Sequence, residues 1–318
     1  MLKIKTFNAA VVGILALAAV SIFLVAQSDW QHTQAVSVLV TVAGKGNSAP
    51  PDVPKDAVYV HQDNQTRGVL DWDSLSQGGS NLELVVYVDD ALDHSVGVQL
   101  EDVAAFIRAL PPNTRVEVAY SLGGVPQVGQ SFTTDREAAI RAVHIPLGRT
   151  AGSYGLYSGL SDLVKAWTSE ATRREILIIS DGLDFLRGRS QLLPGENPDL
   201  DALMDLLRRG NIAAFAIFAN GGPAQFHDPT FVSIGQSCLE YLSDETGGEA
   251  FTGVSTAPSF KPYLDRISQD LAHQYLLTFA VSTSPKPKLS RLKVGAEVSG
   301  AVVYAPAHIL VPATPASQ

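Results

Sequence analysis

The sequence predicts a doubly wound α/β domain with a mostly parallel sheet, flanked on both sides by β-rich segments. Apolar strands alternate with amphipathic helices of about ten to fifteen residues between positions 83 and 275. This alternation is typical of a sheet that carries crossover helices on both faces. We expect four parts: a targeting segment over 1–28, a β-rich segment over 29–82, the α/β domain over 83–275, and a C-terminal β segment with a tail over 276–318.

The helices of the α/β domain are predicted from their apolar period and from their ends. Pro111 and Pro112 stop the first helix, Thr134 or Asp135 caps a second one, and Gly210 ends a later one. The predicted strands are 83–88, 115–121, 127–132, 175–180, 211–218 and 249–252. The predicted long helices are 99–110, 156–169, 199–209, 231–245 and 259–273. We expect 127–132 to be an antiparallel edge strand, because two glycines turn the chain back before it.

The flanks are predicted from runs of β-branched residues. Residues 57–61 and 66–72 are expected to pair as a hairpin across Asp63, Asn64 and Gln65. The other predicted strands are 36–42, 274–281, 289–298 and 301–304. The two flanks could join into one small sandwich, and the tail from Ala305 is expected to fray.

Composition and charge narrow the classes of function. The chain has 318 residues, is 46% hydrophobic and has a mean hydropathy of +0.12, so it can bury a large core. The net charge of −9 and the absence of any dense Lys/Arg run argue against nucleic acid as a partner. The seven histidines form no His-x-x-x-His pair, and no Gly-x-Ser-x-Gly motif occurs, which disfavours a zinc site and a serine hydrolase.

The N-terminus has the pattern of an export signal. Lys3 and Lys5 precede the apolar stretch 9–25, and residues 26–28 offer a small-x-small cleavage site. We expect an exported protein, either periplasmic and associated with the cell envelope or secreted. A retained anchor is the alternative, and would be the only contact with the membrane, because the stretch approaches the lower limit for a span. Cys238 is the only cysteine, and we expect a buried, inert thiol.

Carboxylates follow two of the predicted strands. Asp89, Asp90 and Asp93 come after the strand 83–88, and Asp181 comes directly after the strand 175–180. Ligands of open α/β sheets sit beyond the carboxyl ends of the strands, and carboxylates are hard ligands suited to Ca²⁺ or Mg²⁺. The alternative is that these side chains cap loops and helix starts. Asp90 fits the capping alternative, and Asp184 is expected to be a solvated loop residue.

The ordered set of elements and motifs resembles the von Willebrand factor type A domain, and in particular the exported bacterial group called VWFA-related. The resemblance covers roughly residues 83–275. It rests on four pieces of sequence: Val-Asp-Asp-Ala-Leu-Asp at 88–93, Ile-Ser-Asp-Gly at 179–182, Glu-Thr-Gly-Gly-Glu-Ala-Phe at 245–251 and His-Gln-Tyr-Leu-Leu-Thr-Phe at 273–279. It implies a Rossmann-like sheet, no catalysis, and a divalent cation held by an Asp-x-Ser-x-Ser loop, a Thr and a third-loop Asp. A partner's carboxylate usually completes that site.

The resemblance carries over onto this chain only in part, which implies a degenerate metal site. Asp89 matches the first Asp and Asp181 the third-loop Asp. Ala91 stands at the first Ser and cannot ligate, while Asp93 stands at the second Ser and adds a negative charge. Because the surplus charge would repel an incoming carboxylate, capture of an acidic partner through the metal is weakened.

The second loop of the site also departs from the family pattern. Tyr154 lies where the Thr is expected, and Ser153 or Thr150 could replace it. The predicted metal ligands are therefore Asp89, Asp93, Asp181 and Ser153, with Ca²⁺ or Mg²⁺ as the cation.

These observations predict an exported, non-enzymatic protein-interaction or adhesion-type module with an unknown protein partner. One alternative is a structural domain with a vestigial site that acts through its β flanks. Another is a receiver-like phospho-acceptor or enzyme, since an acidic pair at a strand end also occurs in receiver domains. That alternative expects a Lys at a later strand end, but the strand 211–218 leads into Ala219, Asn220 and Gly221.

Overall fold

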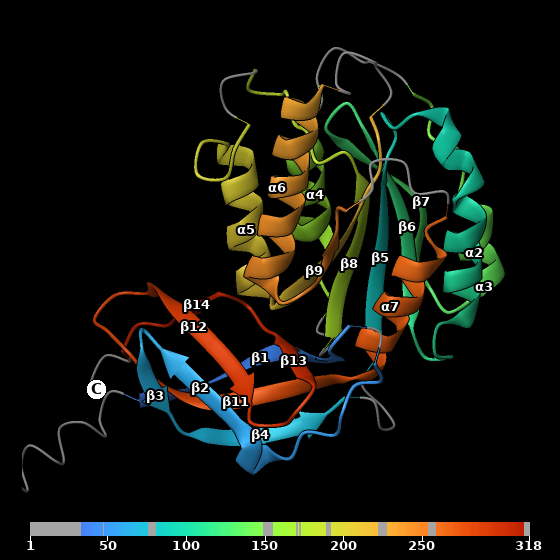
Figure 1. Cartoon of the computed structure of the whole chain (residues 1–318). Coiled ribbons are helices and arrows are strands. Elements are labelled where there is room, and N and C mark those ends of the chain that lie inside the picture. The colour runs from blue at the N-terminus through green and yellow to red at the C-terminus, as the bar shows by residue number, and fades with distance from the viewer. Residues whose placement is uncertain are drawn as a thin grey trace, which may run out of the picture.

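The computed structural model describes residues 33–46, 48–75, 81–148, 155–169, 171, 173–188, 192–221, 228–253 and 259–314. Within them the chain forms a six-stranded sheet with helices on both faces and two four-stranded antiparallel sheets below it (Figure 1). The predicted fold class is confirmed. The targeting segment 1–28 lies outside the described residues. None of the helices in the described part combines the length and the apolar character that a membrane span requires.

The large sheet has the strand order β10-β9-β8-β5-β6-β7. All neighbours are parallel except β7, which runs antiparallel to β6 at one edge, as predicted. Every residue of β5 is buried, because helices cover both faces of the sheet. The strands are β5 (Leu82–Asp89), β6 (Arg115–Leu122), β7 (Val125–Thr133), β8 (Arg173–Ser180), β9 (Ile212–Phe218) and β10 (Ala250–Phe251).

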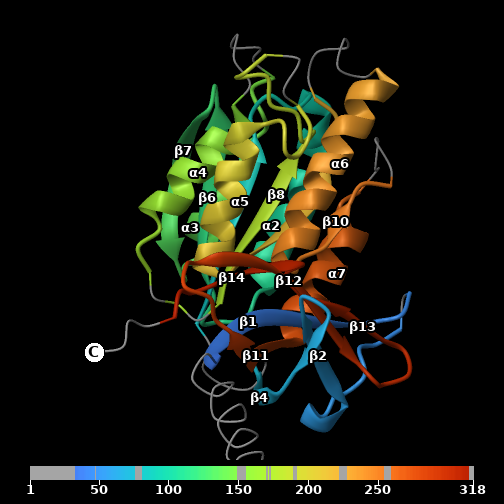
Figure 2. The same ribbon diagram turned by 90° about the vertical axis from the view of Figure 1, so that its left-hand side faces the viewer.

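The helices lie in two layers, one on each face of the sheet (Figures 1 and 2). One layer holds α2 (Leu100–Ala109), α3 (Arg136–Arg141) and α7 (Lys261–Ala272), and the other holds α4 (Leu156–Ala166), α5 (Pro198–Gly210) and α6 (Pro229–Thr246). Asp135 caps α3 by accepting the N–H of Ala138 at 3.0 Å, which confirms one of the two predicted caps. Trp167, which follows α4, is buried, and its Nε1 donates to Glu83 at 2.7 Å.

Each of the two smaller sheets combines strands from both ends of the chain, so the flanks join. One sheet has the order β13-β1-β11-β4 and the other β14-β12-β2-β3. Their inward-facing apolar side chains share one core. The strands are β1 (Thr33–Gly44), β2 (Val58–Gln62), β3 (Gln65–Arg67), β4 (Val69–Ser74), β11 (Gln274–Ser282), β12 (Lys288–Ala296), β13 (Ala301–Tyr304) and β14 (His308–Val311); the short 3-10 helix η2 (Lys55–Ala57) precedes β2.

The predicted hairpin is correct at its turn and wrong in its second strand. Asp63 and Asn64 both have positive φ, at 49° and 66°, which is the geometry of a two-residue hairpin turn. β3 pairs with β2, but it ends at Arg67, and β4 pairs with β11 of the other sheet instead. Gly68 marks the change of sheet, and its carbonyl accepts the N–H of Ala280 at 3.2 Å.

The expectation of a fraying tail from Ala305 is wrong as far as residue 314. β14 pairs with β12, with Leu310 opposite Leu289, and buries Ile309 and Val311 in the shared core. The strand is only four residues long and lies among prolines and alanines. Four positions are too few for a period in the sequence to indicate a strand.

Candidate functional site at the carboxyl edge of the sheet

The carboxyl edge of the large sheet is the place where its topology predicts a ligand. β5 is the first strand of the sheet along the chain, β6 lies on one side of it and β8 on the other. Such a reversal of strand order opens a crevice beyond the carboxyl ends of the two strands. Asp89 is the last residue of β5, Asp181 follows β8, and Val88 lies opposite Ile179 in the register. The structure therefore places Asp89 and Asp181 at the same edge of the sheet, as the sequence predicts.

Both carboxylate oxygens of Asp89 accept hydrogen bonds. Oδ1 accepts the backbone N–H of Ala91 at 3.0 Å, and Oδ2 accepts the hydroxyl of Ser180 at 2.9 Å. The side chain is buried, and this burial raises the pKa of Asp89 to about 6 despite the two donors. Two hydrogen bonds thus hold the Asp89 carboxylate in place, but they do not offset the cost of burying its negative charge.

Asp181 has one bonded oxygen and one oxygen without a partner. Oδ1 accepts the N–H of Leu183 at 3.0 Å, whereas Oδ2 is buried and finds no hydrogen-bond partner in the described part of the chain. Gly221 closes over it: a Cβ atom at Gly221 would lie 2.0 Å from Oδ2. Burial and then the charge of Asp89 raise the pKa of Asp181 well above its ordinary value. A buried carboxylate in this setting requires a proton or a cation.

The expectation that Asp184 is solvated is wrong. Asp184 is buried, with Oδ2 accepting the N–H of Tyr157 at 3.0 Å and Oδ1 that of Leu186 at 2.9 Å. The bond to Tyr157 satisfies one of the unpaired N–H groups in the first turn of α4, where a negative charge is favoured. Burial still raises the pKa of Asp184 to about 6. Asp184 holds the loop after β8 against α4.

Asp90 and Asp93 serve the loop after β5. Asp90 accepts the N–H of Leu147 at 2.8 Å, so it holds a distant loop rather than the helix start that follows β5. Asp93 is half-buried and caps the 3-10 helix η3 (His94–Val98) by accepting the N–H of Ser95 at 2.8 Å. The predicted ligand role of Asp93 therefore competes with a local structural role for Oδ1.

The second loop of the predicted site falls outside the described residues. Thr150, Ser153 and Tyr154 belong to it, so their predicted roles stay predictions. Among the residues whose placement is described, no group of three or more His, Cys, Asp and Glu side chains is arranged to hold a metal. The described part of this edge thus contributes a pair of carboxylates, Asp89 and Asp181, to any cation site.

Two hydroxyls at this edge, those of Ser180 and Tyr157, are not among the predicted site residues. Ser180 donates to Asp89 and accepts the N–H of Gly182 at 3.0 Å, so it joins the ends of β5 and β8. The Tyr157 hydroxyl donates to the carbonyl of Gly182 at 2.6 Å. The position of Ser180 directly before Asp181 was a usable signal, because both lie at the same strand end. Tyr157 gave no comparable signal, since it lies far from Gly182 in the sequence.

The thiol of Cys238 lies close to this edge and is inert. The side chain is fully buried, as predicted, and its sulfur contacts the carbonyl of Leu192 at 3.2 Å. Burial raises the pKa of the thiol to about 11, which disfavours the nucleophilic thiolate form.

Comparisons with known proteins gave matches among solved structures only. No family model and no curated protein matches the chain. The chain is similar to a von Willebrand factor type A protein from Catenulispora acidiphila, at 14% identity and a TM-score of 0.41, over 85% of this chain and 75% of the other. It is also similar to the von Willebrand factor domain of a type V pilus tip protein from Porphyromonas gingivalis, at 11% identity and a TM-score of 0.43, over 61% and 96%.

A third similar structure is an aerotolerance-related membrane protein from Bacteroides fragilis, at 14% identity and a TM-score of 0.39, over 60% of this chain and 98% of the other. Structural neighbours of the chain are thus von Willebrand factor type A domains, several of them bacterial. This is the family that the sequence resembles.

Proposed function

We propose that this protein is an exported, non-enzymatic protein-interaction module of the von Willebrand factor type A kind. Its binding face is the carboxyl edge of the sheet, where a divalent cation binds between Asp89 and Asp181. The observation that carries this proposal is the buried Oδ2 of Asp181, which has no hydrogen-bond partner in the described part of the chain and lies beside a second carboxylate.

A divalent cation suits this pair for reasons of charge and ligand hardness. Two carboxylates neutralise such an ion, and carboxylate and hydroxyl oxygens are the ligands that Ca²⁺ and Mg²⁺ prefer. Asp181 supplies its unbonded oxygen, Asp89 a second carboxylate, and Ser180 a hydroxyl that already contacts Asp89. Asp93 and Ser153 are the further candidate ligands. When bound, the ion would offset the negative charge of the carboxylates at this edge.

A binding role without catalysis is supported by the state of the reactive groups at this edge. The Ser180 hydroxyl donates to a carboxylate with a raised pKa, and the Tyr157 hydroxyl donates to a backbone carbonyl. Among the residues that the structure describes, neither hydroxyl is bonded to a histidine that could act as its base. Export is proposed from the basic and apolar pattern of residues 1–28.

Calorimetric titration of Ca²⁺, Mg²⁺ and Mn²⁺ into the purified chain tests the cation. Asp181→Asn keeps the shape of the side chain and its acceptor for Leu183, but removes the charge. Asp162→Asn, at an exposed acid on α4, is the matched control. We expect saturable binding in the wild type and the control, and at least tenfold weaker binding in Asp181→Asn.

Absence of saturable binding at millimolar ion, with the protein folded by circular dichroism, would contradict the cation site. That result would favour the alternative in which the carboxyl edge is vestigial and the β flanks make the contacts.

A further inference from the structure

Strand β1 is paired along only part of one side. It pairs with β11 over almost its full length, but β13 covers its other side only from Thr41 to Gly44. Over residues 34–40, no described strand pairs with that second side. This half-paired strand lies at the opposite end of the molecule from the carboxyl edge, next to the end of α5 (Figure 1). It is therefore independent of the function proposed above.

The direction of the backbone groups on this side follows from two hydrogen bonds. The N–H of Val42 donates to the carbonyl of His273, the residue directly before β11. The N–H of Leu39 points to the other side of β1 and donates to the side-chain oxygen of Asn211 at 3.2 Å. Backbone groups alternate in direction along a strand, so those of Ser37 and Ala35 point to the same side as those of Leu39. Asn211 thus occupies one position that a neighbouring strand would fill, and no described strand occupies the next positions.

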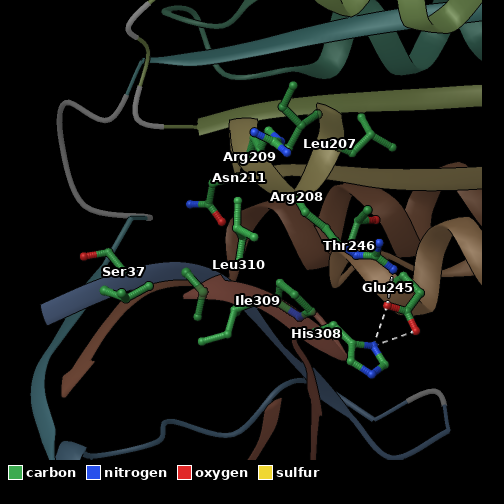
Figure 3. Close-up of a pocket in the computed structure, with 14 residues that line it drawn as sticks. Ser37, Leu207, Arg208, Arg209, Asn211, Glu245, Thr246, His308, Ile309 and Leu310 are labelled. Carbon is green, nitrogen blue, oxygen red and sulfur yellow. Dashed lines mark hydrogen bonds and ion pairs between the residues drawn. The ribbon is translucent and has the colours of Figure 1, made fainter. Parts of the chain in front are cut away.

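A pocket opens at this place between β1, β14 and the end of α5. Its volume is about 240 Å³, and Figure 3 shows Asn211 reaching from the end of α5 toward β1, with Leu310 beside it. Its apolar lining includes Val38, Leu207, Ile212 and Ile309. The pocket is smaller than the typical site for a cofactor or drug-sized ligand, and its size suits one or two apolar side chains.

Three of the charged or titratable side chains that line the pocket pair with one another. Glu245 pairs with Arg208 at 2.7 Å and with Nδ1 of His308 at 2.8 Å, as the dashed lines in Figure 3 mark for His308. Arg209 also lines the pocket, and its positive charge lies in the last turn of α5, where it offsets the negative end of the helix dipole. Complementarity of charge therefore selects an uncharged ligand.

We propose that this groove binds an extended, uncharged peptide segment of a partner protein, which adds to β1 beside Ser37 as a new strand. The segment's backbone pairs with Ser37 and Ala35, and one apolar side chain fills the pocket beside Leu310. Backbone hydrogen bonds of this kind supply affinity, and the pocket supplies specificity for the anchor side chain. The N–H and C=O groups of β1 that have no partner strand in the described part of the chain favour this class of ligand, because an extended backbone matches their spacing.

The variant Ser37→Pro isolates the open side of β1. Proline at position 37 removes the N–H that faces the groove. The bonds from β1 to β11 remain, because the residues on either side of Ser37 make them. Ser37→Ala is the matched control, because both variants lose the hydroxyl bond from Ser37 to Thr278 but only the proline loses the N–H. Leu310→Trp, which fills the pocket, tests the anchor separately.

The probe is a phage-displayed library of random nonapeptides, selected on the purified wild-type chain. We expect peptides with alternating apolar residues to be enriched. The selected peptide, synthesised and titrated by fluorescence polarisation, should bind Ser37→Ala like the wild type, and both Ser37→Pro and Leu310→Trp at least tenfold more weakly. If Ser37→Pro does not fold, Leu310→Trp decides the result.

Three outcomes would overturn the proposal. One is a selection that enriches no peptide, and another is equal binding of the selected peptide to the wild type, Ser37→Pro and Leu310→Trp. The third is a wild-type dimer in sedimentation that Ser37→Pro dissociates, since the groove would then be the contact for a second copy of this chain.

Discussion

The hydroxyl of Ser180 donates a 2.9 Å hydrogen bond to Oδ2 of Asp89, and this bond joins the ends of the two central strands, β8 and β5. Both residues are buried, so water does not replace the bond if it is lost. The same hydroxyl accepts the N–H of Gly182, where the chain turns with a φ of +70°. Ser180 thus connects the position of Asp89 to the turn that carries Asp181.

Ser180→Ala should therefore destabilise the fold by about 1–3 kcal/mol, the usual cost of leaving a buried polar group unsatisfied. Urea unfolding measures the change. Ser131→Ala, at an exposed serine of β7, should change the free energy of unfolding by no more than about 0.5 kcal/mol. Equal stability of the two variants would show that the bond to Asp89 contributes nothing to the fold.

Gly221 should not tolerate even one added methyl group. A Cβ at this position would lie 2.0 Å from Oδ2 of Asp181, well inside the contact distance. Gly221→Ala should lower the free energy of unfolding by about 1–3 kcal/mol, as overpacking of a buried site does. Thermal unfolding checks this, with Gly68→Ala as the control, because a Cβ at Gly68 meets nothing within 4 Å. A similar loss in both variants would mean that backbone freedom rather than the contact with Asp181 matters.

The fold was predictable because local pattern and global topology agree in it. The strand 175–180 is apolar between its first and last residues and buried on both faces, and the helices around it carry clear end signals. The convergence of Asp89 and Asp181 followed from the same rule of parallel sheets. The errors concern elements with weak local signals. β14, which is four residues long, was not predicted, and β4 was assigned to the wrong sheet because the chain changes sheets at a single glycine.

The details of the site were less predictable because they depend on contacts between distant segments. Asp184 was expected in solvent, but the start of α4 covers it and donates the N–H of Tyr157. No pattern in the sequence indicates that two segments 27 residues apart meet in this way. The sealing of Asp181 by Gly221 has the same character, since it depends on the path of the loop after β9.

Stability should fall as the pH rises, in part because of Glu175. This carboxyl is fully buried near Arg173 and Gln274, and burial raises its pKa to about 7 from an ordinary value of 4.5. The folded state therefore holds its proton more tightly than the unfolded state does. The stabilisation is complete below about pH 4.5 and is lost as the pH rises through about 7. Asp270, with a pKa raised to about 8, and Asp89 act in the same direction.

Urea midpoints measured at pH 5, 7 and 9 check this dependence. The wild type should lose stability across the series, and Glu175→Gln should lose less, with a difference on the order of 2 kcal/mol. Glu101→Gln, at an exposed acid in α2, should follow the wild type. A wild-type midpoint that rises with pH would show that the charged form of Glu175 is the stable one.

Glu245 should be the most sensitive member of the ion pairs at the pocket between α5 and β14. Its carboxylate contacts Arg208 and His308, and the side chain of Arg208 is only 8% exposed. Glu245→Gln leaves the guanidinium of Arg208 with Asp205 at 3.7 Å as its one remaining acidic contact in the described chain. Removing one partner of a buried pair costs about 3–5 kcal/mol, because the other charge is left uncompensated.

Asp265→Asn, which breaks the exposed pair with Lys261, should cost about 0–1 kcal/mol in the same denaturation experiment. If both variants lost equally little, water would be compensating Arg208, and the ion pairs could not keep the pocket free of net charge.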